Sequence, residues 1–206
     1  MNLSRWSALM LAGLACLFGF VGCQRGNESP EPSAQIEPTD APETVEKLPS
    51  MRDERFATAV AAKDDLFQTL SGRLMEVMQT EGPVAAIRVC SEDAPKIAQT
   101  VADEHGVEIG RTSWKLRNPD NAPRDWVQPF VDQKADLPQT VTLEDGRLGV
   151  TFPIRLDVKC LMCHGGPDDV LDSVKPELAK RYPDDQATGF KAGDLRGMFW
   201  VEVPAT

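Results

Sequence analysis

Three residues with strong ligand chemistry lie close together in the segment "VKCLMCHGGP", residues 158–167. They are Cys160, Cys163 and His164, although all 206 residues together contain only five cysteines and two histidines. Glycine and proline follow them at once, so burial in a hydrophobic core does not explain the cluster. The spacing indicates instead that the three side chains have a chemical role.

The order Cys-x-x-Cys-His is the attachment signature of a c-type haem. Two thiols one helical turn apart can each add to one vinyl group and form two thioethers, and the adjacent imidazole then lies under the iron as an axial ligand. The segment predicts one covalently bound haem c, attached through Cys160 and Cys163 and ligated by His164.

Other functions use the same residue types. Cys-x-x-Cys is half of a zinc site, which Cys90 with His105 or His164 could complete in a zinc-stabilised binding module. A haem-dependent, peroxidase-like enzyme needs an open iron site and a distal acid–base group. His105, the other of the two histidines, is the candidate for that group. His105 stands in "DEHGVE", a context that is typical of a helix end and favours a structural role. A thioredoxin-like dithiol requires a βαβ context, which the sequence lacks.

Residues 1–23 are typical of a lipoprotein signal peptide. A positive charge at Arg5 precedes the uncharged run "WSALMLAGLACLFGFV", and Gly22-Cys23 follows as in a bacterial lipobox. We expect cleavage to leave Cys23 as a lipidated N-terminus, and an uncleaved membrane anchor is the alternative. Gln24 replaces the aspartate that favours inner-membrane retention, so we expect an outer-membrane lipoprotein on the periplasmic side.

Residues 24–50 are rich in Pro, Glu, Ser and Thr and predict a disordered tether, because such a segment buries too little apolar surface to offset its ordering entropy. Residues 51–206 then form the haem-binding domain. The chain carries 32 acidic and 22 basic residues, a net charge of −10. This balance argues against nucleic acid as a partner, because phosphate binding requires clustered Lys and Arg. The same acidic balance argues against adhesion to anionic lipids through a basic patch. The membrane contact that we expect is the lipid anchor at Cys23.

From residue 51 on, apolar residues recur first at helical and then at strand spacing. Residues Arg52–Glu81 predict one long amphipathic helix, with an apolar stripe of Phe56, Val60, Phe67, Leu70, Leu74 and Val77. A second helix opens at Pro83 and is kinked or split near Ser91 by Pro95. The remaining elements are a strand from Val107, a helix at 123–133 with Trp126 and Phe130 turned inward, a hairpin around Asp145-Gly146, a helix at 170–181 and a strand at 194–203. The pattern predicts an α+β fold, in which long N-terminal helices pack on a small, mostly antiparallel sheet.

Cys90 is the cysteine that has no other assignment, because Cys16 lies inside the signal peptide and would leave with it. It shares a helical stripe with Ile87, Ala94 and Ile97, so it faces the interior. A small buried hydrophobe and an iron ligand both fit this position, and the residues alone leave the choice open.

Three basic residues, Arg111, Lys115 and Arg117, lie two or four positions apart. An extended strand could direct them the same way. Because a buried carboxylate requires a partner and a basic side chain supplies one, we hypothesise that one of them neutralises a haem propionate. A solvated strand face is the alternative.

Most of the predicted domain resembles a bacterial family of c-type haem domains with a PAS-like fold, formerly classed as a domain of unknown function. The matching segments are "AIRVCSEDAPKIA", "GRTSWKLRNPDNAP", "FPIRLDVKCLMCHGG" and "YPDDQATGFKAGDLRG". The resemblance implies a PAS-like sheet, His164 as the proximal ligand, and Cys90 as the sixth ligand of the iron. Members of the family occur alone or as sensor modules ahead of signalling domains. We expect that a sensor role of this chain would require a separate signalling protein.

These observations predict an exported, lipid-anchored monohaem c-type protein. It would transfer electrons to a redox partner protein, or sense redox state or a small ligand for a separate signalling protein. An electron carrier or sensor fits better than an enzyme, because the sequence offers few acid–base groups for catalysis.

Overall fold

The computed structural model describes residues 54–205 of the chain. Its α-helices are α1 (Glu54–Thr80), α2 (Pro83–Arg88), α3 (Ala94–His105), α4 (Gln128–Asp132), α5 (Leu161–His164) and α6 (Lys175–Arg181). Its strands are β1 (Glu108–Thr112), β2 (Gln139–Thr142), β3 (Leu148–Arg155) and β4 (Leu195–Val203). A π-helical turn, η1 (Val89–Asp93), joins α2 to α3, and two 3-10 turns are η2 (Pro119–Asn121) and η3 (Val158–Cys160).

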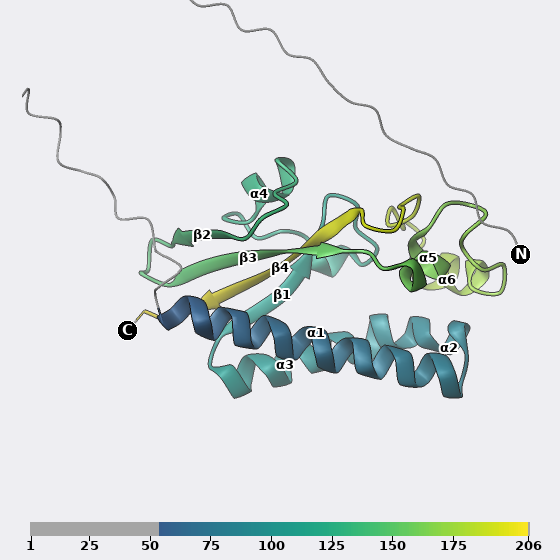
Figure 1. Cartoon of the computed structure of the whole chain (residues 1–206), viewed down its shortest axis with the longest axis horizontal. Helices are drawn as coiled ribbons and strands as arrows, with labels where there is room; N and C mark the ends of the chain where they lie inside the picture. Colours follow the sequence, from purple (N-terminus) through teal and green to yellow (C-terminus); the bar gives the residue numbers. More distant parts are fainter. Residues whose placement is uncertain (1–53, 206) are drawn as a thin grey trace, which may run out of the picture. The chain divides into compact units, whose positions relative to one another are not determined.

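The four strands form one antiparallel sheet in the order β1-β4-β3-β2. Helices α1 and α3 cover one face of it, and α4 lies on the other side (Figure 1). Helices α5 and α6 lie beyond one end of the sheet, next to the α2 end of the helical layer (Figure 1). The predicted fold class, α+β with a small antiparallel sheet and N-terminal helices packed on it, is confirmed. The predicted signal peptide, the predicted lipidation site at Cys23 and the predicted tether lie outside the described residues.

Helix α1 packs on the sheet through a stripe that includes alanines. Phe56, Ala59, Ala62 and Leu66 follow one another at helical spacing and are all buried. The predicted stripe is wrong for Phe67, whose surface is 54% exposed. Because the prediction counted only large apolar residues, it missed the alanines, whose small side chains bring the helix close to the sheet.

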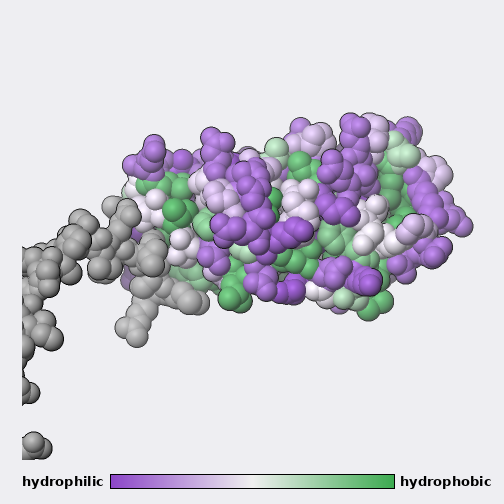
Figure 2. Space-filling view, turned by 90° about the horizontal axis from the view of Figure 1, so that it is seen from above, coloured by the Kyte–Doolittle hydropathy of each residue, from purple (hydrophilic) through white to green (hydrophobic). Residues whose placement is uncertain are grey.

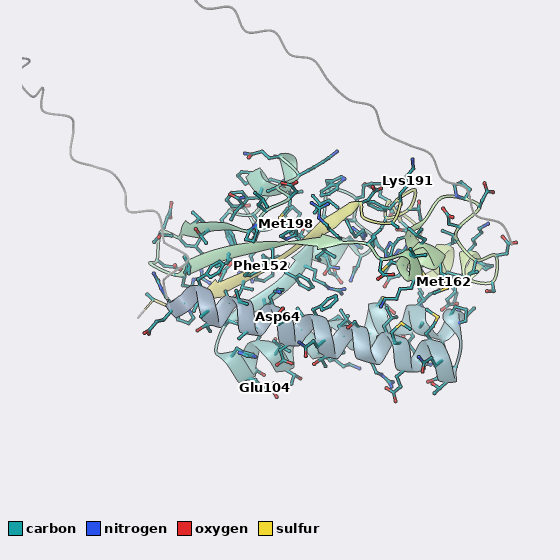
Figure 3. All side chains as sticks on the ribbon, viewed as in Figure 1. Asp64, Glu104, Phe152, Met162, Lys191 and Met198 are labelled. Atoms are coloured by element: carbon teal, nitrogen blue, oxygen red, sulfur yellow. The ribbon has the colours of Figure 1, made fainter. Side chains whose placement is uncertain are left out.

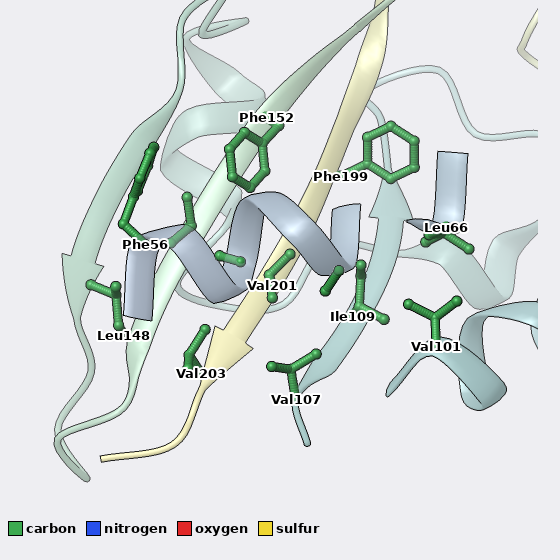
Figure 4. Close-up of a cluster of buried hydrophobic side chains, with 13 residues drawn as sticks. Phe56, Leu66, Val101, Val107, Ile109, Leu148, Phe152, Phe199, Val201 and Val203 are labelled. Carbon is green, nitrogen blue, oxygen red and sulfur yellow. The ribbon is translucent and has the colours of Figure 1, made fainter. Parts of the chain in front are cut away.

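The main core lies between this helical layer and the sheet (Figure 4). The rings of Phe56 on α1 and Phe152 on β3 lie 5.9 Å apart between their centroids. Burial of each large side chain contributes about 1.5–3 kcal/mol. The other large members are Leu66, Val101, Val107, Ile109, Leu148, Val150, Phe199, Val201 and Val203.

The second helical segment continues through the predicted break as a π-turn. In η1 the Ala94 amide donates to the carbonyl of Val89, five residues back. The next residue, Pro95, has no amide hydrogen, so the ordinary helical bond cannot form at its position. π-turns inside α-helices occur frequently at functional sites. This one contains Cys90, and it lies where a kink or split near Ser91 was predicted.

Two short helices begin later than the sequence predicts. Helix α4 starts at Gln128 instead of near Pro123, and α6 starts at Lys175 instead of near Val170. Each has a proline at its second residue, and proline favours the first turn of a helix because its missing amide hydrogen is not needed there. The residues directly before each of these two helices form turns instead of helix.

The outer face of the sheet carries a smaller cluster. Val127, Val131 and Met198 are buried there, and Trp126 and Phe130, which were expected to face inward, pack against them half-buried. Seen from above, the surface is mostly hydrophilic, with apolar side chains scattered between the polar ones (Figure 2). Within residues 54–205, no helix is both long and apolar enough to cross a membrane.

Strands β1 and β4 approach closely where Gly197 faces the last residues of β1. A Cβ atom at Gly197 would lie 2.2 Å from the carbonyl oxygen of Thr112 and 3.0 Å from the Cβ of Ser113. Such a contact requires the two strands to separate, so Gly197→Ala should lower the free energy of unfolding by about 1–3 kcal/mol. Urea denaturation followed by circular dichroism measures this.

Gly72 in α1 provides the matched control, because nothing lies within 4 Å of its added Cβ. Gly72→Ala should be neutral or stabilise the fold by up to about 1 kcal/mol, since alanine is the better helix former. Equal stabilities of the two variants would show that the strands at Gly197 can move apart without cost.

Candidate cofactor cavity

A cavity lies where the C-terminal half of α1, the helical segment around η1 and the ends of β1, β3 and β4 meet the Cys-x-x-Cys-His segment. It is partly open to solvent. Its apolar walls come from α1, α2, β3 and the adjoining loops. They are Leu70, Leu74, Met78, Ala86, Ile87, Leu116, Ile154 and Leu156.

The motif residues line this cavity together. Cys160 ends η3, and Cys163 and His164 belong to α5, so the segment is a continuous short helical stretch. The Asp157 side chain caps it by accepting a hydrogen bond from the amide of Lys159. Both cysteines are free thiols and partly buried. Burial raises the pKa of the Cys163 thiol above its ordinary value.

His164 presents a neutral imidazole. Its Nδ1 lies 2.7 Å from the carbonyl oxygen of Ala187, to which it donates a hydrogen bond. Burial, together with the positive charges of Arg117 and Arg196, lowers the pKa of His164 to about 3. With Nδ1 protonated and bonded to the carbonyl, Nε2 keeps a free lone pair, which is the state that a metal-ligating histidine requires.

The segment 185–190 anchors the Cys-x-x-Cys-His segment through backbone hydrogen bonds. The Gly189 amide donates to the carbonyl of Gly165 at 2.7 Å, and the Phe190 amide donates to that of His164 at 3.0 Å. Arg117 joins the same two segments. Its guanidinium donates to the carbonyl of Cys163 at 2.5 Å and pairs with Asp185 at 2.9 Å. The motif is therefore anchored through both its backbone and its histidine.

Gly165 allows this anchoring for a steric reason. A Cβ atom there would lie 2.4 Å from the Cβ of Asp169 and 2.7 Å from the carbonyl oxygen of Leu161. Its backbone is extended, with φ of −72° and ψ of −170°, so conformational freedom is not what the position demands. Glycine at this position lets the chain turn directly after His164 and run alongside residues 185–190.

Cys90 reaches the same cavity from the opposite layer. It lines the cavity, is partly buried, and lies in the η1 turn. Helix α6 supports this turn, because Arg181 donates to Ser91 Oγ at 3.1 Å and to Glu92 Oε1 at 2.7 Å. The structure thus brings both residues expected to ligate the iron, His164 and Cys90, to one cavity.

The three basic residues of the segment 111–117 do not share one direction. Arg111 and Arg117 line the cavity, whereas Lys115 does not. The Lys115 ammonium donates to the Thr188 carbonyl and lies 4.7 Å from the centre of the Phe190 ring. Because β1 ends at Thr112, the alternation that would aim the three side chains together stops before Lys115.

Arg196 is a cavity residue that the sequence reasoning missed. It lies near the start of β4, and its Nη1 donates to the carbonyl of Lys115 at 3.1 Å. Its Nε is buried and has no hydrogen-bond partner. Burial and the neighbouring guanidiniums of Arg117 and Arg111 lower its pKa to about 10. No local pattern in "DLRGMF" marks this arginine, because only the pairing of β1 with β4 places it here.

Other candidate ligands lie elsewhere. His105 does not line the cavity, and its Nε2 lies 3.2 Å from a carboxylate oxygen of Asp65 on α1. Met198, whose thioether is a common type of haem ligand, is 1% exposed in the outer cluster of the sheet. Figure 3 shows Met198 in the sheet, well separated from Met162 in α5. Among the described residues, no three His, Cys, Asp or Glu side chains are grouped closely enough to hold a metal ion, as the zinc alternative requires.

Comparisons with known proteins agree with this architecture. A model of the Tll0287-like family matches residues 34–204. Among solved structures, the crystal structure of the cyanobacterial heme-protein Tll0287 matches with 27% identity and a TM-score of 0.55, covering 75% of this chain and 97% of that chain. No curated protein matches. The family match spans the whole cavity and confirms the resemblance seen in the sequence. The chain therefore belongs to the Tll0287-like family.

Proposed function

We propose that this protein binds one haem c covalently in the cavity described above. The observation that carries the proposal is the joint placement of Cys160, Cys163, His164 and Cys90 around one largely apolar cavity. The donor set fits the group, because two thiols and a neutral imidazole lie on one side and a further thiol on the other. The family relationship to a structure described as a heme-protein supports the same ligand.

Each residue has a defined task in this proposal. Cys160 and Cys163 would hold the macrocycle through thioethers, and His164 would offer Nε2 to the iron while the Ala187 carbonyl fixes its ring. Cys90 offers its sulfur from the η1 turn. When bound, the haem supplies one-electron redox chemistry. The apolar walls from α1 and α2 exclude water from the face that they cover.

Electron transfer or redox-linked sensing fits the cavity better than catalysis. A peroxidase-like reaction needs an acid–base group at an open iron site. His105 is turned toward Asp65, and among the described lining residues no aspartate or glutamate is present. A sulfur ligand from Cys90 would also occupy a coordination position that such a reaction needs open. We therefore propose a redox or sensor protein that acts with a separate redox partner or signalling protein.

The absorption spectrum of the purified protein, together with haem staining after denaturing electrophoresis, tests the proposal. Covalent haem with a low-spin ferric iron is the expected result. A high-spin ferric iron would favour the peroxidase-like alternative. A protein without haem after expression with a cytochrome c maturation system would refute the proposed function.

We further propose that the protein is exported and anchored by a lipid at Cys23, on the periplasmic side of the outer membrane. The support is the sequence of residues 1–23 and the polar segment that follows. Export also suits the cofactor, because bacteria attach haem c outside the cytoplasm.

Replacement of the anchoring cysteine should change the location of the protein. Cys23→Ala should shift most of the protein from the membrane fraction to the soluble fraction, or block its processing, because no acyl chains can be attached. Fractionation and mass spectrometry of the N-terminal peptide measure this. Cys16→Ala is the matched control and should fractionate like the wild type. An unacylated wild-type N-terminus would contradict the anchor.

A further inference from the structure

The cavity contains more positive charge than its neighbouring carboxylates neutralise. Three guanidinium groups line it, from Arg111, Arg117 and Arg196, and no described aspartate or glutamate does. Arg117 is paired with Asp185, and both side chains are largely buried, at 9% and 12% exposure. Two guanidinium charges therefore remain without a carboxylate. Lys159 also lines the cavity, but it is exposed and solvated.

These two arginines also have donors to spare. Within the described residues, no hydrogen bond or ion pair involves the Arg111 guanidinium, and Arg196 Nε is buried without a partner. Thr112 Oγ1, in a residue that also lines the cavity, is a second buried polar atom without a partner. Leaving a buried donor unpaired is costly, so such atoms at a cavity wall indicate a ligand that satisfies them.

We propose that Arg111 and Arg196 form an anion site that binds the two propionate carboxylates of the haem, with the Thr112 hydroxyl as a further donor. The proposal rests on the proposed function. Two carboxylates match the two unneutralised charges, and the forked guanidinium suits a carboxylate. Burial lowers the pKa of both arginines, yet guanidinium groups stay protonated at neutral pH, so the charge is available.

The neighbouring basic residues have a different role in this arrangement. Arg117 is occupied by Asp185 and the Cys163 carbonyl, and Lys115 by the Thr188 carbonyl. Both hold the wall behind the motif and have few donors left for a ligand. Arg196 thus takes the place that the sequence suggested for Lys115 or Arg117.

The test uses the haem-loaded full-length protein and the variants Arg111→Gln and Arg196→Gln. The resonance Raman band of propionate bending reports hydrogen bonds to the propionates, and redox titration gives the midpoint potential. We expect both variants to keep covalent haem, to shift this band, and to show a lower potential, because a positive charge near the haem is lost. Lys159→Gln is the matched control, since it removes an exposed charge from the same cavity, and its band should stay in the wild-type position.

If the glutamine variants do not accumulate, Arg196→Lys tests whether Arg196 donates hydrogen bonds to a propionate. It keeps the charge but removes the forked donor, so its band should shift while its potential stays near the wild-type value. Haem-loaded variants whose propionate band is unchanged would overturn this inference alone. A wild-type protein that does not stain for haem would overturn the proposed function, and this inference with it.

Discussion

Replacing both Cys160 and Cys163 with alanine is expected to remove essentially all covalently bound haem. The two thiols lie one turn apart, on η3 and α5, and both face the cavity beside His164. Without them no thioether can form, so any remaining haem is held only through its axial ligands and its propionates. Haem held in this way dissociates when the protein is denatured.

Acid–acetone extraction and haem staining after denaturing electrophoresis measure the loss. The wild-type protein should retain its haem through both procedures, and the double variant should lose it. Each single variant, which keeps one thioether, should still stain. Cys90→Ala provides a control that removes a cavity thiol outside the motif, and it should stain like the wild type. A double variant that still stains would show that the attachment lies elsewhere.

The second large effect is expected from Cys90→Ala. The variant should keep its covalent haem, but its ferric iron should change from low-spin to high-spin or water-ligated. A thiolate adds negative charge to the iron and stabilises the ferric state, so its loss should raise the midpoint potential. Axial ligands set haem potentials over a range of about 0.8 V, so a rise on the order of tenths of a volt is expected. Electron paramagnetic resonance and redox titration measure both changes.

Ser91→Ala separates loss of the ligand from disturbance of the turn. Ser91 lies next to Cys90 in η1 and receives the hydrogen bond from Arg181, but its side chain does not line the cavity. This variant should keep the wild-type spin state. If the ferric spectrum of Cys90→Ala equals that of the wild type, another residue ligates the iron. Met78, a methionine of the cavity wall, would then be the next candidate, because His105 and Met198 lie elsewhere.

The features that the sequence predicts well depend on neighbours along the chain. Cys160, Cys163 and His164 lie within five positions, so their joint placement follows from one short turn. The break near Ser91 follows from Pro95, whose missing amide hydrogen acts locally. The fold class also follows from local periodicity, first helical and then alternating. Cys90 is intermediate: the predicted stripe with Ala94 and Ile97 is interrupted by the π-turn, and only the tertiary structure shows that Cys90 faces the cavity of the motif.

The features that the sequence predicts poorly depend on tertiary contacts. Arg196 enters the cavity because β4 pairs with β1, and residue order along the chain gives no sign of this pairing. The acceptor for His164 is a backbone carbonyl, that of Ala187, and any residue type could provide it. Phe67 was misassigned because the side of α1 that contacts the sheet is chosen by how closely the alanines let the two approach.

The π-turn at residues 89–93 has a geometric consequence for the two helices on either side of it. Each residue of an ordinary α-helix advances the side chains by about 100° around the axis. A turn closed by a bond over five residues instead of four inserts one such step, so α2 and α3 are out of phase with each other. Ile87 can thereby point toward Leu178 in α6 and Tyr182 directly after it, while Val101 points toward the sheet. One uninterrupted α-helical phase would have to give up one of these two directions, and the thiol of Cys90 lies where the phase changes.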